Sequence, residues 1–277
     1  IILIDVANGR IDMQKAQTGE LEMTPLLFLV NNLTLALWVP LSLLTAWAAF
    51  QQRPKWLSSI QGGFRWRLFW RFALIALVVL GASTGVQILL EGGVGGLAWN
   101  SDSVFLIVTI VLTTPFQAAG EEYSLRGLGA RTIGSWFGSR RAGLIVATLV
   151  TSIVFMLLHG AGDPWLNAFY LLFAVLSSIL VWRTGGLEAS IALHVVNNLI
   201  GEAFLPFSDI SGIFDREAGV AGPETLWQMG AVVVVAGLML WQAGRLRLPR
   251  TAAPAAPAQT ELSKPGGVFW NSSHTIA

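Results

Sequence analysis

The chain of 277 residues contains no cysteine and few charged residues, which make up 12% of it against 54% apolar residues. The lack of cysteine excludes disulfides, thiolate catalysis and cysteine-based metal sites. A soluble globular domain carries about twice this share of charge, so the composition disfavours a soluble protein. The 17 basic residues are balanced by 16 acidic ones, and this near-neutral charge disfavours nucleic-acid binding.

Long apolar segments, 29 glycines and 12 tryptophans are typical of a polytopic helical membrane protein. A helix needs about 20 mostly apolar residues to cross the hydrocarbon core. Six uncharged segments meet this length: 23–52, 72–90, 103–120, 142–162, 164–182 and 225–244. A seventh, 187–207, is interrupted by Glu188 and Glu202. We therefore expect an all-α transmembrane helix bundle with seven visible spans, because continuous apolar segments do not suit barrel strands.

Successive connecting segments must lie on alternate sides of the membrane, and this assignment divides the charged residues into two sets. One set of connecting segments contains 13 basic residues, and the other contains 3 basic and 11 acidic residues. Because cytoplasmic loops are enriched in lysine and arginine, the first set, with the C-terminus, is predicted to be cytoplasmic. The basic set comprises residues 51–71, 131–141, 183–186 and 245–277, and the acidic set comprises residues 1–22, 91–102, 163 and 208–224.

The two ends of the chain differ from its apolar middle. Residues 1–22 are predicted to be extracytoplasmic, and their start, an Ile-Ile-Leu-Ile run, resembles the end of a preceding span. We therefore expect one more helix upstream, eight in all. Residues 23–248 form the predicted transmembrane domain. Residues 249–277, rich in alanine and proline, are predicted to be a disordered cytoplasmic tail.

Three short segments favour structural roles. Residues 62–72 interleave arginine with aromatic residues, which fits an interfacial helix or, as we favour, an anchor for the next span. Residues 81–85 match G-x-S-x-G, but inside a span they favour a close contact between small residues of two helices. Residues 160–163 match G-x-G-D and are expected to form a turn before Pro164.

Ionisable residues inside a membrane span cost about 2.5 kcal/mol or more each, so they are candidates for function. In this chain they form three motifs: Glu-Glu-x-x-x-Arg at 121–126, Phe-x-x-x-His at 155–159 and His-x-x-x-Asn at 194–198. The candidate site residues are Glu121, Glu122, Arg126, His159, His194 and Asn198.

The two adjacent glutamates differ in their helical neighbours. Glu122 can pair with Arg126 one turn on, in the favourable acid-first order. Glu121 projects about 100° away and has Leu125, not a base, one turn on. The spacing predicts that Glu121 is a general base and Glu122 a structural acid.

Together these side chains suit the attack of a water molecule on a carbonyl. A desolvated carboxylate is an effective general base, and a nearby histidine can orient the same water or ligate a metal. A second histidine and an asparagine carboxamide supply donors for a tetrahedral oxyanion. Taken singly, the first motif is more often a helix end whose long side chains reach the interface, and the third an interhelical hydrogen-bond pair. Their joint presence favours a site.

The predicted depths of the two histidines in the membrane differ too much for a single site in straight, upright helices. At a rise of about 1.5 Å per residue, His194 lies about 10 Å from the cytoplasmic face and His159 about 27 Å. One site therefore requires helix tilt, deeper entry of the fourth span or a thinner bilayer.

In order and spacing, the three motifs resemble those of the CPBP family of intramembrane proteases, which includes the CAAX prenyl endopeptidases of the Rce1 type and the bacterial Abi proteins. The resemblance covers about residues 70–205. It implies a protease domain over residues 23–248, an eight-helix bundle with a cavity reached from the cytosol, and a location in a bacterial cell membrane. It also implies an endopeptidase that acts on a membrane-associated peptide or protein within the lipid bilayer. It does not extend to prenylated substrates.

The family motifs also imply roles for the candidate residues. Glu121 and His159 would hold the catalytic water, and His194 and Asn198 would form the oxyanion site. Glu122 and Arg126 would support them. A divalent metal such as Zn²⁺, if used, would be held by Glu121, His159 and His194, although the chain contains no H-E-x-x-H motif.

Two other functions fit the same residues. A proton-coupled transporter also places ionisable groups in its spans, but it tends to contain internal repeats, which this sequence lacks. A catalytically idle family member could act as a membrane scaffold or a bacteriocin-immunity-type protein. Cleavage of a membrane-embedded peptide by the purified protein would separate the endopeptidase from both.

Overall fold

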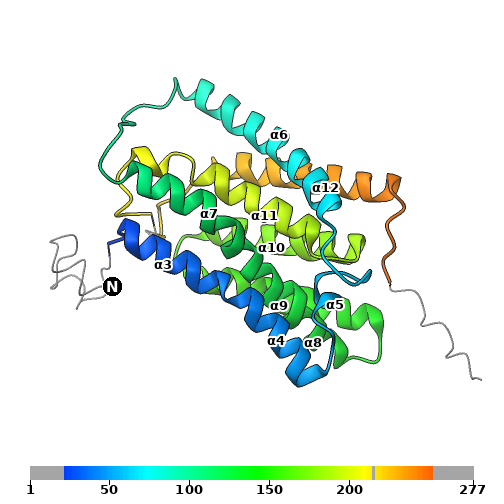
Figure 1. Cartoon of the computed structure of the whole chain (residues 1–277). Helices are drawn as coiled ribbons and strands as arrows, with labels where there is room; N and C mark the ends of the chain where they lie inside the picture. The colour runs from blue at the N-terminus through cyan, green and yellow to red at the C-terminus, as the bar shows by residue number, and fades with distance from the viewer. Residues whose placement is uncertain (1–21, 214–215, 252–277) are drawn as a thin grey trace, which may run out of the picture.

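The structure, a computed structural model, describes residues 22–213 and 216–251; the predictions for residues 1–21 and for the tail after residue 251 lie outside this range. Within it the chain forms a helical bundle without strands (Figure 1). Six helical segments are long and apolar enough to cross a membrane, as expected for a polytopic bundle. They are Pro25–Phe50, Trp66–Leu90, Ser103–Ser135, Arg140–Leu158, Pro164–Thr184 and Thr225–Arg245.

The first of these segments is broken in its middle. It consists of α3 (Pro25–Ala36) and α4 (Trp38–Phe50), which meet at Leu37. Pro40, in the first turn of α4, has no N–H to donate to the carbonyl one turn earlier, so the hydrogen-bond ladder is interrupted here.

The aromatic and basic segment at 62–72 forms mainly the start of a long helix. After the short α5 (Lys55–Ser58), α6 runs over Trp66–Leu90 and begins six residues earlier than predicted. Trp66 and Trp70 are exposed on its surface. This matches the anchor interpretation.

The third span also exceeds its predicted length. α7 (Ser103–Glu122) continues into η1 (Tyr123–Gly129), a π-helix, and then into α8 (Ala130–Ser135). A π-turn inside an α-helix often marks a functional site. Here it directly follows the two candidate glutamates.

α9 (Arg140–Leu158) and α10 (Pro164–Thr184) are joined by the predicted turn. Gly160 has a φ of 62°, and the carboxylate of Asp163 caps α10 by accepting the Trp165 and Leu166 N–H groups. The turn interpretation of residues 160–163 is confirmed.

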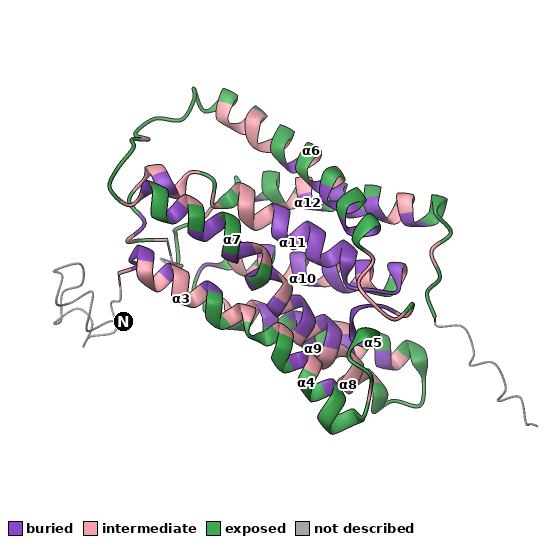
Figure 2. Ribbon diagram, viewed as in Figure 1, coloured by how far each residue is buried: buried purple, intermediate pink, exposed green. Residues whose placement is uncertain are grey.

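The seventh predicted span contains α11 (Glu188–Gly201) and the short η2 (Leu205–Phe207), before α12 (Thr225–Arg245) ends the described helices. α11 is about 21 Å long, shorter than the hydrocarbon core of about 30 Å. All residues from 188 to 196 are buried, and α11 packs against α6, α7 and α10 (Figures 1 and 2). This segment is therefore a central helix enclosed by protein, which has no need to match the bilayer.

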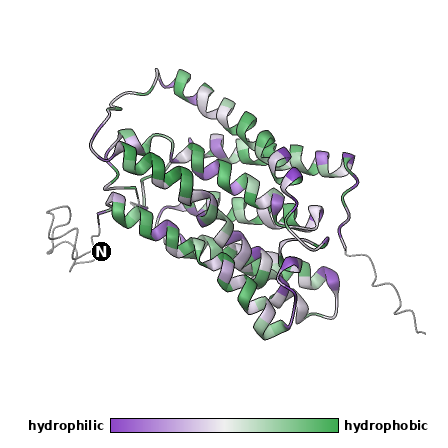
Figure 3. Ribbon diagram, in the orientation of Figure 1, coloured by the Kyte–Doolittle hydropathy of each residue, from purple (hydrophilic) through white to green (hydrophobic). Residues whose placement is uncertain are grey.

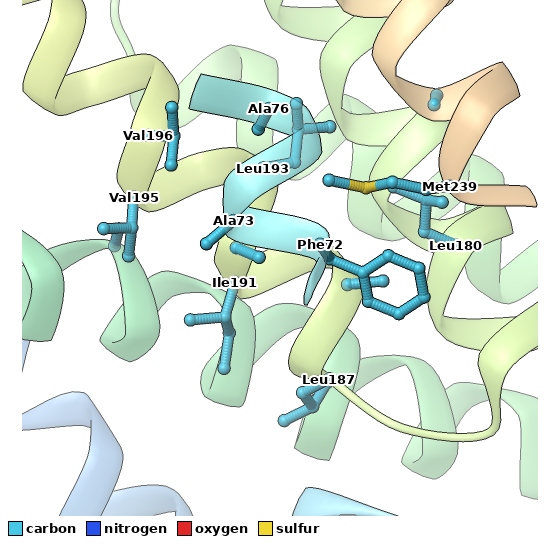
Figure 4. Close-up of a cluster of buried hydrophobic side chains, with 14 of the residues drawn as sticks. Phe72, Ala73, Ala76, Leu180, Leu187, Ile191, Leu193, Val195, Val196 and Met239 are labelled. Carbon is cyan, nitrogen blue, oxygen red and sulfur yellow. The ribbon is translucent and has the colours of Figure 1, made fainter. Parts of the chain in front are cut away.

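The core around α11 is apolar and includes side chains of α6 and α12. Figure 4 shows Leu193 and Ile191 of α11 beside Phe72 and Ala76 of α6, with Met239 of α12 close by. These five side chains are at most 3% exposed. α11 is thereby held at the centre of the bundle.

The outer surface of the bundle is also apolar. Many positions on the outer faces of α6 and α7 are exposed, as the green of Figure 2 shows, and apolar, as the green of Figure 3 shows. Many large hydrophobic side chains are exposed there. A surface of this kind is suited to lipid and not to water.

One sequence interpretation is wrong at this surface. Gly81 and Gly85 on α6 were expected to make a close helix contact, but no described atom lies within 4 Å of the place where either Cβ would be. The two glycines lie on a part of α6 that no neighbouring helix covers closely.

An ion pair fixes the start of α11. The Nη2 and Nε groups of Arg65 donate to the fully buried carboxylate of Glu188 at 2.6 and 2.9 Å, and the Arg65 backbone N–H donates to it at 2.8 Å. Beside this pair, Ser59 and Gly186 form an isolated antiparallel bridge. The loop before α6 is thus tied to the helix that carries His194.

Candidate active site

Two antiparallel helices, α7 and α11, carry facing polar side chains at intervals of one turn. Glu121 faces His194, with Oε2 and Nε2 3.8 Å apart. One turn away, the Nδ2 group of Asn198 donates to Oε1 of Gln117 at 3.1 Å. One turn further, the Thr114 hydroxyl donates to Glu202 at 2.6 Å. We call these three pairs the polar ladder.

Glu122 lies behind the ladder and is fully buried. Its Oε1 accepts hydrogen bonds from Nη1 of Arg126 at 3.2 Å and from Nδ1 of His194 at 3.0 Å. Arg126 is itself 1% exposed and stacks over the ring of Phe155, 4.5 Å from its centroid. Glu122 and Arg126 therefore hold the His194 ring in place from the interior of the bundle.

Glu121 points the other way and lines a cavity. Its Oε1 accepts a hydrogen bond from Nε2 of Gln117, and its Oε2 faces His194. No described lysine or arginine forms an ion pair with it. The two adjacent glutamates thus lie in different surroundings, as the helical spacing predicts.

His159 directly follows α9 and lines the same cavity. Its Nδ1 lies 2.8 Å from the Phe155 carbonyl, so Nδ1–H donates there and Nε2 is left as the acceptor. The ring stacks on Tyr170 with centroids 4.0 Å apart. This hydrogen bond and this stacking fix both the orientation and the tautomer of the ring.

The expected obstacle of depth does not separate the two histidines. Phe155 lies between them, with its ring centroid 4.5 Å from that of His159 and 5.8 Å from that of His194. α11 starts within the bundle at Glu188 and α9 ends at Leu158, so the short central helix brings His194 to the end of α9.

Gln117 is a polar residue of the site that our sequence analysis missed. It lies one turn before Glu121, and its amide accepts from Asn198 and donates to Glu121. The Asn197 amide in turn donates to Oδ1 of Asn198 at 3.3 Å. The signal was available, because an uncharged polar residue four positions before a candidate base shares its helix face.

The cavity has a volume of about 980 Å³. Glu121, His159 and Asn198 line it, whereas His194, Glu122 and Arg126 lie behind its wall. Its remaining walls come mainly from α3, α4, η1, α8 and α10, and most of them are apolar. The cavity can therefore hold an apolar chain against a small polar surface.

The described side chains do not assemble a metal site of three ligands. In the described part of the chain, no three acidic, histidine or cysteine residues gather closely enough to hold a metal ion. His194 already uses Nδ1 on Glu122. As placed, Glu121, His159 and His194 do not fit a three-ligand ion, and the involvement of Zn²⁺ stays a prediction.

Asp163 is excluded from the site by its bonding. Burial opposes its ionisation, but the backbone N–H groups of Leu166, Gly219, Ala221 and Trp165 donate to it and lower the pKa of its carboxyl. Two of these donors belong to the first turn of α10 and two to the loop before α12. Asp163 is a structural carboxylate.

Comparisons with known proteins bear on this region. Residues 102–200 match the family described as Type II CAAX prenyl endopeptidase Rce1-like. The chain is 26% identical over 149 residues to the uncharacterized protein YyaK of Bacillus subtilis (strain 168), a match that covers 50% of this chain and 48% of YyaK. The chain thus spans about half the length of this curated relative. No solved structure matches the chain significantly.

The family match covers all three motifs, the whole of α7 and α11 up to residue 200, but not Glu202. The apolar helices and the match together make this an integral membrane protein. The similarity to the Rce1-like family lies in residues 102–200, the part of the chain that contains the three motifs.

Proposed function

We propose that the protein is an intramembrane endopeptidase that hydrolyses a peptide bond of a membrane-associated substrate. The observation that carries the proposal is that Glu121, His159 and Asn198 line one cavity, with Nε2 of His194 3.8 Å from Oε2 of Glu121. The family match supports the same class of reaction.

In the first step, a water molecule binds between Glu121 and His159. Nε2 of His159 accepts one hydrogen bond from it, because Nδ1–H is used on the Phe155 carbonyl. Oε2 of Glu121 takes a proton from the water, and the resulting hydroxide attacks the substrate carbonyl carbon. Gln117 holds the other oxygen of this carboxylate.

In the tetrahedral intermediate, the negative charge lies on the former carbonyl oxygen. Asn198 can donate to it, since only one of its two amide hydrogens is used on Gln117. His194 donates through Nε2 only when both ring nitrogens carry protons, because Nδ1–H is held by Glu122. The carboxylates of Glu121 and Glu122 lie on either side of this ring and would offset its charge.

In the last step, Glu121 passes its proton to the leaving nitrogen as the C–N bond breaks. The products are a carboxylic acid and an amine, and Glu121 returns to its carboxylate form. Phe50, which ends α4 on the predicted cytoplasmic side, also lines the cavity. This supports substrate entry from the cytosol.

The test is cleavage by purified protein in liposomes of quenched fluorescent peptides, with and without a prenyl group on a cysteine. We expect cleavage that Glu121→Gln abolishes and that Glu91→Gln, a change at an exposed glutamate of another region, leaves intact. Equal rates for the wild type and Glu121→Gln, or no cleavage of any peptide by a folded wild type, would overturn the proposal.

A further inference from the structure

The cavity contains a second carboxylate that the proposed reaction does not use. Glu202 directly follows α11 and lines the same cavity as Asn198, four residues or about 6 Å of helix rise away. It forms the last pair of the polar ladder and takes no part in binding the water or the oxyanion.

The bonding of Glu202 leaves one oxygen available. The Thr114 hydroxyl donates to Oε2, and Asn32 on α3 fixes this hydroxyl by donating to it at 3.1 Å. Within the described part of the chain, no hydrogen bond reaches Oε1 and no lysine or arginine forms an ion pair with the carboxylate. The carboxylate is thus oriented by two polar side chains, but its charge has no basic partner.

An ionised carboxylate among apolar walls is unfavourable without a cation. Apolar side chains such as Phe28 of α3 and Ile213 line the same cavity, and Arg216, which also lines it, donates to the His159 carbonyl. A substrate that brings a positive charge into the cavity would supply the missing partner. A substrate with an acidic group at this point would be repelled.

We propose that Glu202 recognises a cationic side chain of the substrate, a lysine ammonium or an arginine guanidinium, about two residues from the scissile bond. This position follows because an extended peptide advances about 3.3 Å per residue, and Glu202 is about 6 Å from the oxyanion donor Asn198. The statement about the scissile bond rests on the proposed function, whereas the recognition of the cation does not.

The first experiment uses N-acetylated peptides and the wild-type protein in liposomes. A lysine is moved through the three positions on each side of the scissile bond and compared with acetyl-lysine, which has nearly the same shape without the charge. We expect kcat/KM to be about fivefold higher for lysine at one position, since a partly exposed charge pair gives a factor of up to this size. Equal values for lysine and acetyl-lysine at every position would overturn the inference.

Variants then connect this preference to Glu202. Glu202→Gln keeps an oxygen for the Thr114 hydroxyl, so the fold is retained and the lysine preference is lost. Glu202→Lys should favour a glutamate in place of the lysine. Glu91→Gln, the matched control outside the cavity, should keep the preference. A lysine preference that persists in Glu202→Gln would show that another group binds the lysine, and would contradict the inference.

Binding separates this inference from the proposed function. Fluorescence anisotropy measures the affinity of labelled lysine and acetyl-lysine peptides for the wild type and for Glu202→Gln, without any turnover. If no peptide is cleaved, the proposed function fails. A lysine-specific affinity that Glu202→Gln removes would still support the site, and equal affinities would overturn it.

Discussion

Glu121 and Glu122 are adjacent in the chain, yet only one of them reaches the cavity. A turn of about 100° places Glu122 among Arg126 and His194, while Glu121 faces the open side. Arg126 offsets the charge of the Glu122 carboxylate inside the protein. The Glu121 carboxylate has no such ion pair and can accept a proton.

The first prediction separates the two residues by stability. Glu121→Gln should be inactive with a nearly unchanged Tm, because it removes no buried ion pair. Glu122→Gln and Arg126→Gln should lower the free energy of unfolding by about 1–3 kcal/mol as well as the activity, because each leaves a buried charge without its partner. Thermal unfolding in detergent and peptide cleavage measure both effects. If Glu121→Gln destabilised the protein and Glu122→Gln did not, the roles would be reversed.

The second prediction concerns Gln117, which acts through its neighbours as a positioning residue. Asn198→Ala should lower kcat by about 10²- to 10³-fold with little change in KM, as for other lost oxyanion donors. Gln117→Leu should lower kcat by about 10²-fold, because Glu121 and Asn198 both lose their orientation. The double variant should lose less than the product of the two single losses, since the residues share one hydrogen-bond chain.

Gln87→Leu, a change at a glutamine near the end of α6 whose hydrogen bond to Glu91 is exposed, is the matched control and should be silent. An effect of Gln117→Leu on KM alone would indicate a substrate contact instead. If Asn198→Ala is silent, Asn197 becomes the candidate donor.

At the residue scale, the motif spacing was sufficient to predict the separation of the two glutamates. The spacing could have pointed to Gln117 on the face of Glu121, but not to its hydrogen bond with Asn198 or to that of Nδ1 of His194 with Glu122. The role of Gln117 depends on which residue of α11 lies opposite, and the ring of His194 is turned by Glu122 from another helix. The periodicity of one helix predicts which of its residues share a face, but not which residues of another helix they contact.

At the scale of elements, the start of α11 depends on Arg65. This arginine precedes α6, and its guanidinium reaches Glu188 across the turn that also carries Gly186. A Cβ on Gly186 would collide with both side chains of the pair. The pair therefore fits only a glycine beside it and sets the position of the helix that carries His194 and Asn198.

The third prediction tests this ion pair. Glu188→Gln and Arg65→Lys should each lower the free energy of unfolding by about 1–3 kcal/mol, less than for a fully enclosed pair because Arg65 is 14% exposed. Arg67→Lys, at an exposed neighbour, should have no effect. Unfolding monitored by circular dichroism gives the comparison. Equal Tm values for all three variants would show that the pair does not stabilise this region.

The helices were predictable as elements because each contains a long apolar segment, but three of their details were not. The break at Leu37, the π-helix after Glu122 and the early end of α11 arise from local backbone geometry and tertiary packing. Apolar composition could not distinguish a lipid-facing span from a helix enclosed by protein. α11 is of the second kind.

At the scale of the whole molecule, the asymmetry of charge predicts how the bundle lies in the membrane. The connecting segments at one end carry 13 of the basic residues, and those at the other carry 3. Substrates can enter the cavity from the cytosol only if the segments rich in basic residues are cytoplasmic.

The fourth prediction is this orientation. The chain has no cysteine, so single cysteines can be placed without background. Ser101→Cys should react with an impermeant thiol reagent in intact cells, whereas Gly138→Cys and Ser263→Cys should react only after the membrane is opened. The opposite labelling pattern would place the C-terminus outside and refute the orientation.

The polar ladder has a consequence for the tolerance of this protein to insertions. Its three pairs meet at one alignment of α7 and α11, and a single residue inserted between Thr114 and Gln117 would turn one part of α7 by about 100° relative to the other. Thr114 and Glu121 could then no longer face their partners together. A change of length in this stretch would therefore cost either the Thr114–Glu202 contact or the Glu121–His194 contact, even where all four side chains are kept.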